Sequence, residues 1–201
     1  MSHVAGHAVV ILAAGASTRL GQPKQLLRRD GETLLHRMVR LANATAPDRL
    51  LVVLPPGQPA LTAAVHGLPC TVAVNPEPQR GMASSLATVA AQVQRFDQVL
   101  VMACDQPALQ EDHLHALLAS ARDARCLCAA TVFDHARGVP AVVPGDWFTT
   151  LGAEGGDSGF RARLRSLEGG SIALLQAPAL GLDIDTPDDL RRAREQGWID
   201  P

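Results

Sequence analysis

Short runs of consecutive apolar residues alternate along the chain with segments in which apolar residues recur at every third or fourth position. The continuous runs are rich in β-branched and aliphatic residues, which is typical of strands buried on both faces of a sheet. This alternation predicts βαβ units, and therefore an α/β fold with a mostly parallel sheet and helices on both faces. The predicted strands are 8–13, 49–54, 70–74, 98–103 and 126–133, and the predicted helices are 32–46, 58–66, 82–94 and 111–122.

The pattern becomes less regular after about residue 132. Residues 138–143 predict a further strand, and a glycine-rich loop precedes a helix expected at 161–167. A last helix is expected at 186–195, because Thr186 suits the N-cap and Pro187 the first helical position, with two aspartates in the first turn. No linker, repeat or low-complexity stretch interrupts the sequence, so we expect a single domain over residues 1–201.

Composition and charge narrow the range of functions. Lys plus Arg (18) nearly balances Asp plus Glu (20), and aromatic residues make up 3% of the chain, so no nucleic-acid or anionic-membrane surface is indicated. No stretch approaches the ~20 apolar residues of a membrane span, and the first residues lack the features of a signal peptide. The four cysteines have no zinc-binding spacing. We therefore expect a cytoplasmic protein with reduced thiols.

The most informative segment is LAAGASTRLGQPK, residues 12–24. It follows the first strand directly, at the carboxyl edge where open α/β sheets bind their ligands. Its small residues would let backbone N–H groups surround an anion, and Arg19 and Lys24 add two positive charges. These groups together favour a polyphosphate. A Walker loop is excluded because five residues separate Gly15 from Gly21, and the G-x-G-x-x-G pattern of dinucleotide-binding loops is absent.

Aspartates supply the second chemical signal. Asp105 comes just after the predicted strand 98–103, so it should lie at the same edge of the sheet. A carboxylate there fits a magnesium site, since Mg²⁺ prefers hard oxygen ligands from one or two side chains together with phosphates and water. Helix capping is the alternative role, although Asp112 is better placed for it. Asp183 and Asp185 offer a second ligand, but Asp185 could instead neighbour the cap of the last helix.

Residues 12–27, LAAGASTRLGQPKQLL, resemble the signature of the MobA-like nucleotidyltransferases. The Ala-Ala-Gly at 13–15 is similar to the branch that contains molybdenum cofactor cytidylyltransferase, whereas guanylyltransferases typically carry Ala-Gly-Gly there. Further motifs follow in the order of the family, so the resemblance extends over nearly the whole chain. They are Asn75 with RGMASSL at 80–86, CDQP at 104–107, GVP at 138–140, GDSG at 156–159 and DIDTP at 183–187.

The resemblance implies a three-layer α/β/α fold of the nucleotide-diphospho-sugar transferase type, with a Rossmann-like sheet. It divides the chain into a nucleotide half of about 1–107 and an acceptor half of about 108–201. The implied activity is Mg²⁺-dependent transfer of CMP from CTP to a phosphorylated acceptor, molybdopterin, with release of pyrophosphate. A molybdoenzyme or its chaperone would be the protein partner, and xanthine-dehydrogenase-like enzymes would use the resulting cytosine dinucleotide cofactor.

The resemblance also assigns roles to single residues. Arg19 and Lys24 would be catalytic, while Asp105 and Asp185 would hold Mg²⁺. The acceptor would contact Gly138, Pro140 and Asp157, although Asp157 could instead cap its own helix. The nucleotide would contact Leu12, Ala13, Ala14, Gly15, Ala16, Ser17, Asn75, Gly81 and Ser85, with Ser85 at the pyrimidine edge.

Three other functions share part of this pattern. A guanylyl-, sugar-phosphate or alcohol-phosphate nucleotidyltransferase would use the same loop and metal site with other substrates. A non-catalytic molybdopterin carrier would keep the pocket but release no pyrophosphate. A nicotinamide-dependent oxidoreductase would have the same fold class, but the missing dinucleotide glycine pattern disfavours it.

Overall fold

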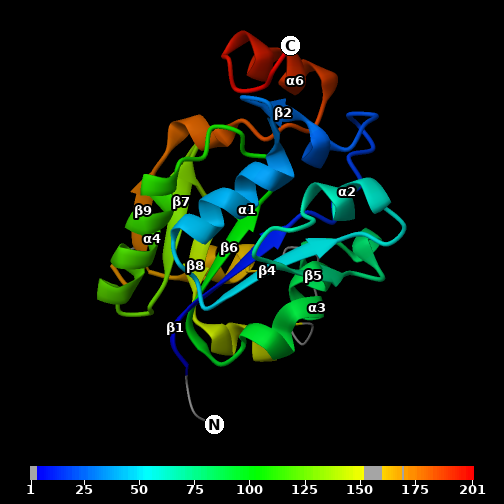
Figure 1. Cartoon of the computed structure of the whole chain (residues 1–201). Coiled ribbons are helices and arrows are strands. Elements are labelled where there is room, and N and C mark those ends of the chain that lie inside the picture. The colour runs from blue at the N-terminus through cyan, green and yellow to red at the C-terminus, as the bar shows by residue number, and fades with distance from the viewer. Residues whose placement is uncertain (1–3, 152–159, 169) are drawn as a thin grey trace.

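The computed structural model describes residues 4–151, 160–168 and 170–201. Its centre is a seven-stranded sheet in the order β5-β4-β1-β6-β8-β7-β9 (Figure 1). A short hairpin of β2 (Arg28–Arg29) and β3 (Glu32–Thr33) forms a second sheet. The strands of the large sheet are β1 (Val4–Leu12), β4 (Arg49–Leu54), β5 (Thr71–Val74), β6 (Phe96–Ala103), β7 (Ala129–Phe133), β8 (Ala136–Val143) and β9 (Ala173–Gln176).

The strands that matter for the site run in the same direction. β1 pairs in parallel with β4 and β6, and β4 pairs in parallel with β5. Leu12, the last residue of β1, lies opposite Val53 and Ala103, so these strands end at the same edge. β8 is antiparallel to its neighbours β6 and β7, and β9 is again parallel to β7. The loops after β1, β5 and β6 therefore meet at one carboxyl edge, where open α/β sheets bind ligands.

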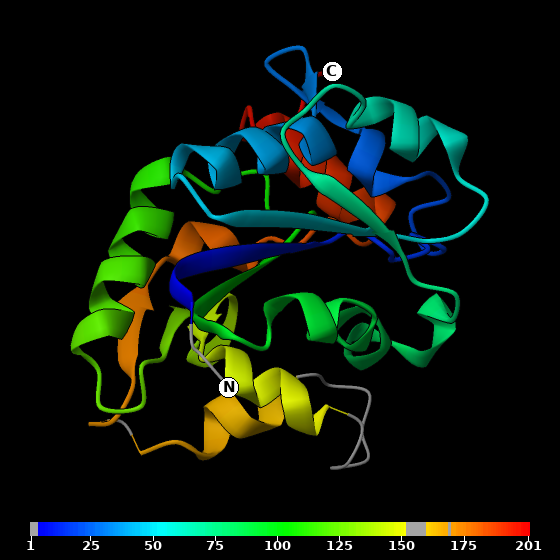
Figure 2. The same cartoon turned by 60° about the horizontal axis from the view of Figure 1, so that its bottom comes forward.

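Helices cover both faces of the sheet, which gives three layers (Figure 2). β1 supplies both apolar cores, because successive strand side chains point to opposite faces: Val9 and Ile11 enter one core, Ala8 and Val10 the other. The first core includes α1 (Leu34–Ala44), α2 (Pro59–Ala64), α4 (Glu111–Asp123) and α6 (Pro187–Glu195); the second includes α3 (Met82–Val93), the 3-10 helix η3 (Gly145–Thr150) and α5 (Arg161–Ser166). Across the ranges that the structure describes, none of the helices combines the length and apolarity of a bilayer span.

Most predicted elements are present with similar bounds. Residues 49–54 form β4 as expected, and α3 matches the expected helix 82–94 to within one residue. α6 begins at Pro187, as predicted, and Thr186 caps it. The Thr186 hydroxyl accepts the Asp189 N–H at 3.2 Å, and the Asp189 carboxylate accepts the Thr186 N–H at 2.8 Å. This reciprocal pair satisfies two N–H groups that would otherwise be unpaired at the start of the helix.

The differences from the predicted elements have local causes. The strand expected from residue 126 begins at Ala129, because Leu127 has a left-handed backbone (φ 53°) that a strand cannot accommodate. The helix expected from residue 32 begins at Leu34, because the two preceding residues pair in the β2–β3 hairpin. β9 is missing from the predicted elements because its residues alternate between half-buried and exposed, so no continuous apolar run marks it.

Candidate active site

The loop after β1 presents a row of backbone N–H groups. Ala13 still donates its N–H to Val53 O at 3.0 Å, as a strand residue would. From Ala14 to Ser17, no N–H has an acceptor among the described residues. The chain turns at Ser17, which has a left-handed backbone (φ 50°) and whose carbonyl accepts the Gly21 N–H at 3.1 Å. Consecutive N–H groups of this kind form an anion-binding concavity.

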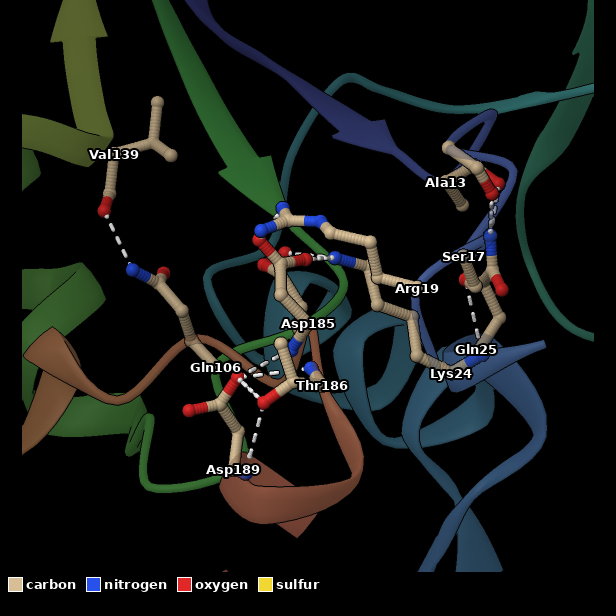
Figure 3. A network of polar contacts seen from close by, with 12 residues as sticks. Ala13, Ser17, Arg19, Lys24, Gln25, Gln106, Val139, Asp185, Thr186 and Asp189 are labelled. Carbon is tan, nitrogen blue, oxygen red and sulfur yellow. Dashed lines mark hydrogen bonds and ion pairs between the residues drawn. The ribbon is translucent and has the colours of Figure 1, made fainter. Parts of the chain in front are cut away.

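Gln25 shapes this loop. Its side-chain amide donates to the carbonyls of Ala13 (2.8 Å) and Gly15 (2.9 Å), and the residue is only 2% exposed (Figure 3). In a trans peptide the C=O and the following N–H point in opposite directions, so the N–H groups of Ala14 and Ala16 face away from Gln25. Gln25 is absent from the site residues predicted from the sequence, because a single glutamine in a loop carries no periodicity or charge of its own.

Lys24 lies between two aspartates at the same edge of the sheet. Its Nζ is 2.5 Å from Asp105 Oδ2 and 2.8 Å from Asp185 Oδ1, and Arg19 reaches the other oxygen of Asp185 at 2.7 Å (Figure 3). Lys24 opens the 3-10 helix η1 (Lys24–Leu26), Asp105 follows β6, and Asp185 precedes α6. The structure thus brings the two predicted catalytic residues into contact with the two predicted metal-binding residues.

Burial and mutual contact control the charges of these groups. Burial alone would lower the pKa of Lys24, but Asp105 and Asp185 more than offset this effect, so the pKa is raised. The hydrogen bond from Lys24 holds the pKa of Asp185 below its usual range. Asp183 behaves differently, because burial, reinforced by repulsion from Asp105 and Asp185, raises its pKa to about 7. Lys24 and Asp185 therefore carry full charges at neutral pH, whereas Asp183 lies close to its titration point.

The donor set at this centre fits a hard divalent cation. Asp105 and Asp185 converge on one cationic atom, Lys24 Nζ. Asp105 Oδ1 and Asp183 Oδ1 are buried without a hydrogen-bond partner in the described part of the chain, and carboxylate oxygens are ligands that Mg²⁺ prefers. The described part of the chain contains no group of three or more His, Cys, Asp or Glu side chains that could hold a metal ion. A metal here would need phosphate oxygens and water to complete its coordination, as is common for Mg²⁺.

Asn75 and two serines form a neutral network at the same edge of the sheet, beyond β1. Asn75 follows β5 and is 1% exposed, and its amide donates to Ser84 Oγ (2.8 Å) and Ser85 Oγ (3.0 Å). Its carbonyl oxygen accepts the Glu77 N–H at 2.9 Å. The two serines lie in the first turn of α3. Asn75 and Ser85, both predicted to bind nucleotide, are thus in contact with each other, and the Asn75 side chain is fully engaged within the protein.

A cleft joins the charged centre to this neutral network. Its volume is about 630 Å³, including the part that is open to solvent. Most of the predicted nucleotide-binding residues line it, whereas Ala16, Ser17 and Asn75 do not. The lining residues are Leu12, Ala13, Ala14, Gly15, Lys24, Gln25, Pro78, Gly81, Met82, Ser85, Ala103, Cys104 and Asp105. The cleft thus presents an anion-binding loop and the Lys24 ammonium to phosphates, and the Ser85 hydroxyl to a neutral group.

The predicted acceptor residues fall into two groups. Gly138 and Pro140 belong to β8, whereas Asp157 lies outside the described residues, together with the rest of the GDSG motif. A Cβ atom at Gly138 would meet the Phe133 ring at 2.9 Å, so a larger residue here would require this ring to shift. Gly138 is therefore packed against Phe133, a contact that does not involve an acceptor.

Gln106, next to Asp105, ties β8 to the charged centre. Its amide donates to Val139 O (2.9 Å) and Leu180 O (3.3 Å), and the residue is 1% exposed. Val139 also lines a smaller, mostly apolar cavity of about 400 Å³ that shares Met82 with the cleft. The wall formed by β8 and the loop that carries Asp105 are therefore held in a fixed relation.

A three-layer α/β/α fold with an anion-binding loop after its first strand, and a lysine held between two carboxylates, defines a site of the nucleotidyltransferase type. Residues 9–171 match the family model described as a MobA-like NTP transferase domain. The chain is 31% identical to the purine catabolism protein PucB of Bacillus subtilis over 196 residues, 92% of this chain and 94% of that protein. It is 36% identical over 104 residues to a probable molybdenum cofactor guanylyltransferase of Synechococcus elongatus, 51% of this chain and 52% of that one.

Solved structures agree with these matches. Rv0371c from Mycobacterium tuberculosis superposes with a TM-score of 0.78 at 28% identity, covering 94% of this chain and 98% of that one. A manganese complex of the same protein superposes with a TM-score of 0.73 at 26% identity, covering 97% and 100%. The chain therefore belongs to the MobA-like NTP transferase family.

Proposed function

We propose that the protein transfers CMP from CTP to a phosphorylated acceptor, molybdopterin, and releases pyrophosphate. The observation that carries this proposal is the position of Lys24. Its ammonium lies between Asp105 and Asp185. Lys24 lines the cleft together with Ala14 and Gly15 of the anion-binding loop. A bound triphosphate would react beside this fixed positive charge.

The loop after β1 would hold the outer phosphates. The N–H groups from Ala14 to Ser17, which have no acceptor among the described residues, would bind the β- and γ-phosphates, and Gln25 keeps the carbonyls of Ala13 and Gly15 turned away. Arg19 is 70% exposed, so its guanidinium can turn from Asp185 toward a phosphate oxygen. Binding at this loop leaves the α-phosphate on the side of Lys24.

Lys24 would act on the α-phosphate. An ammonium group has three protons, and the two aspartates take two of them, so one remains for the substrate. An oxygen of the acceptor phosphate attacks the α-phosphorus in line, the bond to the α–β bridging oxygen breaks, and pyrophosphate leaves with that electron pair. The aspartates hold Lys24 in place beforehand, so little reorganisation is needed as charge develops on the α-phosphate.

Asp105 and Asp185 would also hold a divalent cation, which we propose to be Mg²⁺. When bound, such an ion neutralises phosphate charge and orients the triphosphate. The manganese complex of Rv0371c supports a divalent metal in a protein of this fold. Asp105 Oδ1, which has no hydrogen-bond partner in the described part of the chain, supports the same location.

The choice of substrates rests on the cleft and on the relatives. Ala14 lines the cleft and stands at the position where the cytidylyl branch differs from the guanylyl branch, which favours CTP. The Synechococcus relative supports molybdopterin as the acceptor and makes GTP the competing nucleotide. PucB is named for purine catabolism, which suits a cofactor for xanthine-dehydrogenase-like enzymes. The nucleotide half (1–107) and acceptor half (108–201) would act together in the cytoplasm and pass the product to a molybdoenzyme or its chaperone.

The test is a pyrophosphate-release assay with Mg²⁺, each of the four nucleoside triphosphates in turn, and molybdenum-loaded molybdopterin. Release that requires the acceptor and is fastest with CTP would support the whole proposal. Release fastest with GTP would keep the reaction and change the nucleotide. Release only with a sugar or alcohol phosphate would replace the acceptor, and tight molybdopterin binding without any release would indicate a carrier.

A further inference from the structure

The network around Asn75 has a defined direction. The Asn75 carbonyl oxygen accepts the backbone N–H of Glu77 at 2.9 Å, and a backbone N–H can only donate. The NH₂ group of Asn75 must therefore face Ser84 and Ser85, which fixes the orientation of the amide. Both serine oxygens thus accept a hydrogen bond from Asn75.

The two serines differ in where their own protons go. Ser84 Oγ lies 2.8 Å from Gly81 O and 3.0 Å from Glu77 O, so its proton is used within the protein. Ser85 has no acceptor for its proton in the described part of the chain. Ser85 is 6% exposed and lines the cleft. Asn75 occupies one lone pair of the Ser85 oxygen, so the unused proton of this hydroxyl can donate into the cleft.

The cleft places Ser85 away from the phosphates. Lys24 and Asp105 mark the end of the cleft at β6. Ser85 lies on the opposite side of β1, because it is hydrogen-bonded to Asn75, which follows β5. With the phosphates at the loop after β1 and at Lys24, the part of the lining that remains for the nucleoside is Pro78, Gly81, Met82 and Ser85.

We propose that Asn75 is a positioning residue that makes Ser85 a hydrogen-bond donor toward the nucleobase, so that the site selects CTP over UTP. This inference rests on the proposed function. CTP and UTP have the same size and the same phosphates, so neither the width of the cleft nor the loop can separate them. Cytosine presents O2 and the unprotonated N3 as neighbouring acceptors, whereas uracil carries a proton on N3. Both bases accept at O2, so the selection requires that Ser85 donate to N3, where a donor facing the uracil N3–H leaves both groups unpaired.

The decisive variant is Asn75→Asp, which keeps the shape of the side chain and replaces its donor with an acceptor. The Ser85 proton then turns toward the new carboxylate, and the Ser85 lone pairs face the cleft. We expect CTP affinity to fall about tenfold or more and the preference for CTP over UTP to disappear, since one hydrogen bond is lost and one repulsion is added. Affinity for inorganic tripolyphosphate, which lacks a base, should stay unchanged.

The controls use the two serines and measure nucleotide binding alone, so no phosphorylated acceptor substrate is needed. Ser85→Ala is expected to remove the CTP preference, whereas Ser84→Ala is expected to keep it, and these two variants also decide the matter if Asn75→Asp does not fold. Asn75→Asp added to Ser85→Ala should cause no further change in the CTP-to-UTP ratio. The readout is calorimetric binding of CTP, UTP and tripolyphosphate with Mg²⁺.

The outcomes separate this inference from the proposed reaction. Selective CTP binding that depends on Asn75 and Ser85, without pyrophosphate release, would keep the inference and reject the reaction. A wild-type protein that binds UTP as well as CTP would overturn the inference. So would an Asn75→Asp variant that keeps the CTP preference, or one that loses tripolyphosphate affinity to the same extent as CTP affinity.

Discussion

At the charged end of the cleft, Lys24 contacts aspartates that are 81 and 161 positions away in the chain, whereas at the neutral end Asn75 contacts serines only nine and ten positions away. The charged end exists only when strands and helices from the whole chain are in register. The neutral end lies within one short stretch of chain, from the residue after β5 to the first turn of α3. We infer that the chemistry depends on the global fold, whereas base recognition can be changed by local substitutions without disturbing it.

The largest expected effect is at the charged end. Lys24→Ala removes the proposed donor to the α-phosphate, and losing a transition-state donor of this kind typically costs ~10²–10³ in turnover. We expect kcat to fall by that factor in the pyrophosphate-release assay, while the CTP-to-UTP preference is kept. The matched control is Arg95→Ala, an exposed cation before β6. A loss of less than tenfold would remove Lys24 from the catalytic residues.

Asp105→Asn tests the proposed metal site directly. The substitution keeps the size of the side chain but removes the charge of a mostly buried carboxylate that converges with Asp185. We expect Mn²⁺ affinity, measured by electron paramagnetic resonance without nucleotide, to fall at least about tenfold. Asp188→Asn is the control, because its side chain is 79% exposed. Equal Mn²⁺ affinity in the two variants would place the metal elsewhere.

Gln25→Met is expected to weaken binding of phosphates while leaving the choice of base intact. It removes the donor shared by the Ala13 and Gly15 carbonyls, and unpaired buried acceptors cost about 1–3 kcal/mol. Tripolyphosphate affinity should therefore fall about tenfold by calorimetry, with the CTP-to-UTP ratio unchanged. Gln22→Met, an exposed glutamine in the same loop, is the control. A changed base preference would show that the two ends are coupled.

The smallest effect concerns a charge outside the cleft. Glu32 leads from the Lys24 segment into α1, and hydrogen bonds, above all from Arg40, lower its pKa to about 2. Because the folded-state pKa lies below the unfolded value, this contribution to stability is complete above about pH 4.5. It is lost as the pH falls from there toward 2.

Glu32→Gln should therefore lower the free energy of unfolding by about 1 kcal/mol at neutral pH, a Tm shift of about 2–4 °C. The difference from wild type should shrink as the pH approaches 2. Thermal denaturation followed by circular dichroism at several pH values measures this, with Glu195→Gln, whose side chain is 62% exposed, as the control. A difference that is the same at pH 7 and pH 2 would contradict the role of the Glu32 charge.

The sequence was sufficient for elements whose own residues determine them. β4 and α3 were predictable because one is an unbroken apolar run and the other repeats apolar residues at helical spacing. The direction of β8 was not, because an apolar run does not show which way a strand points. The hairpin of β2 and β3 was also missed, since strands of two residues each have no period to detect.

The candidate site divides in the same way. Lys24, Asp105 and Asp185 were each recognisable from a local motif, but the ion pairs between them depend on the register that sets Leu12 opposite Ala103. Gln25 could not be predicted, because its role comes from the direction of two backbone carbonyls. That direction is a property of the folded loop, and no local sequence signal reports it.

Asp185 is also the last group of the charged centre to be synthesised. Every strand of the large sheet ends by Gln176, so a growing chain already contains the whole sheet, the loop after β1 and Asp105 before Asp185 leaves the ribosome. A chain shortened to the end of the sheet would leave Lys24 with one carboxylate partner in place of two. Under the proposed function, synthesis of the segment that carries Asp185 therefore completes the charged centre.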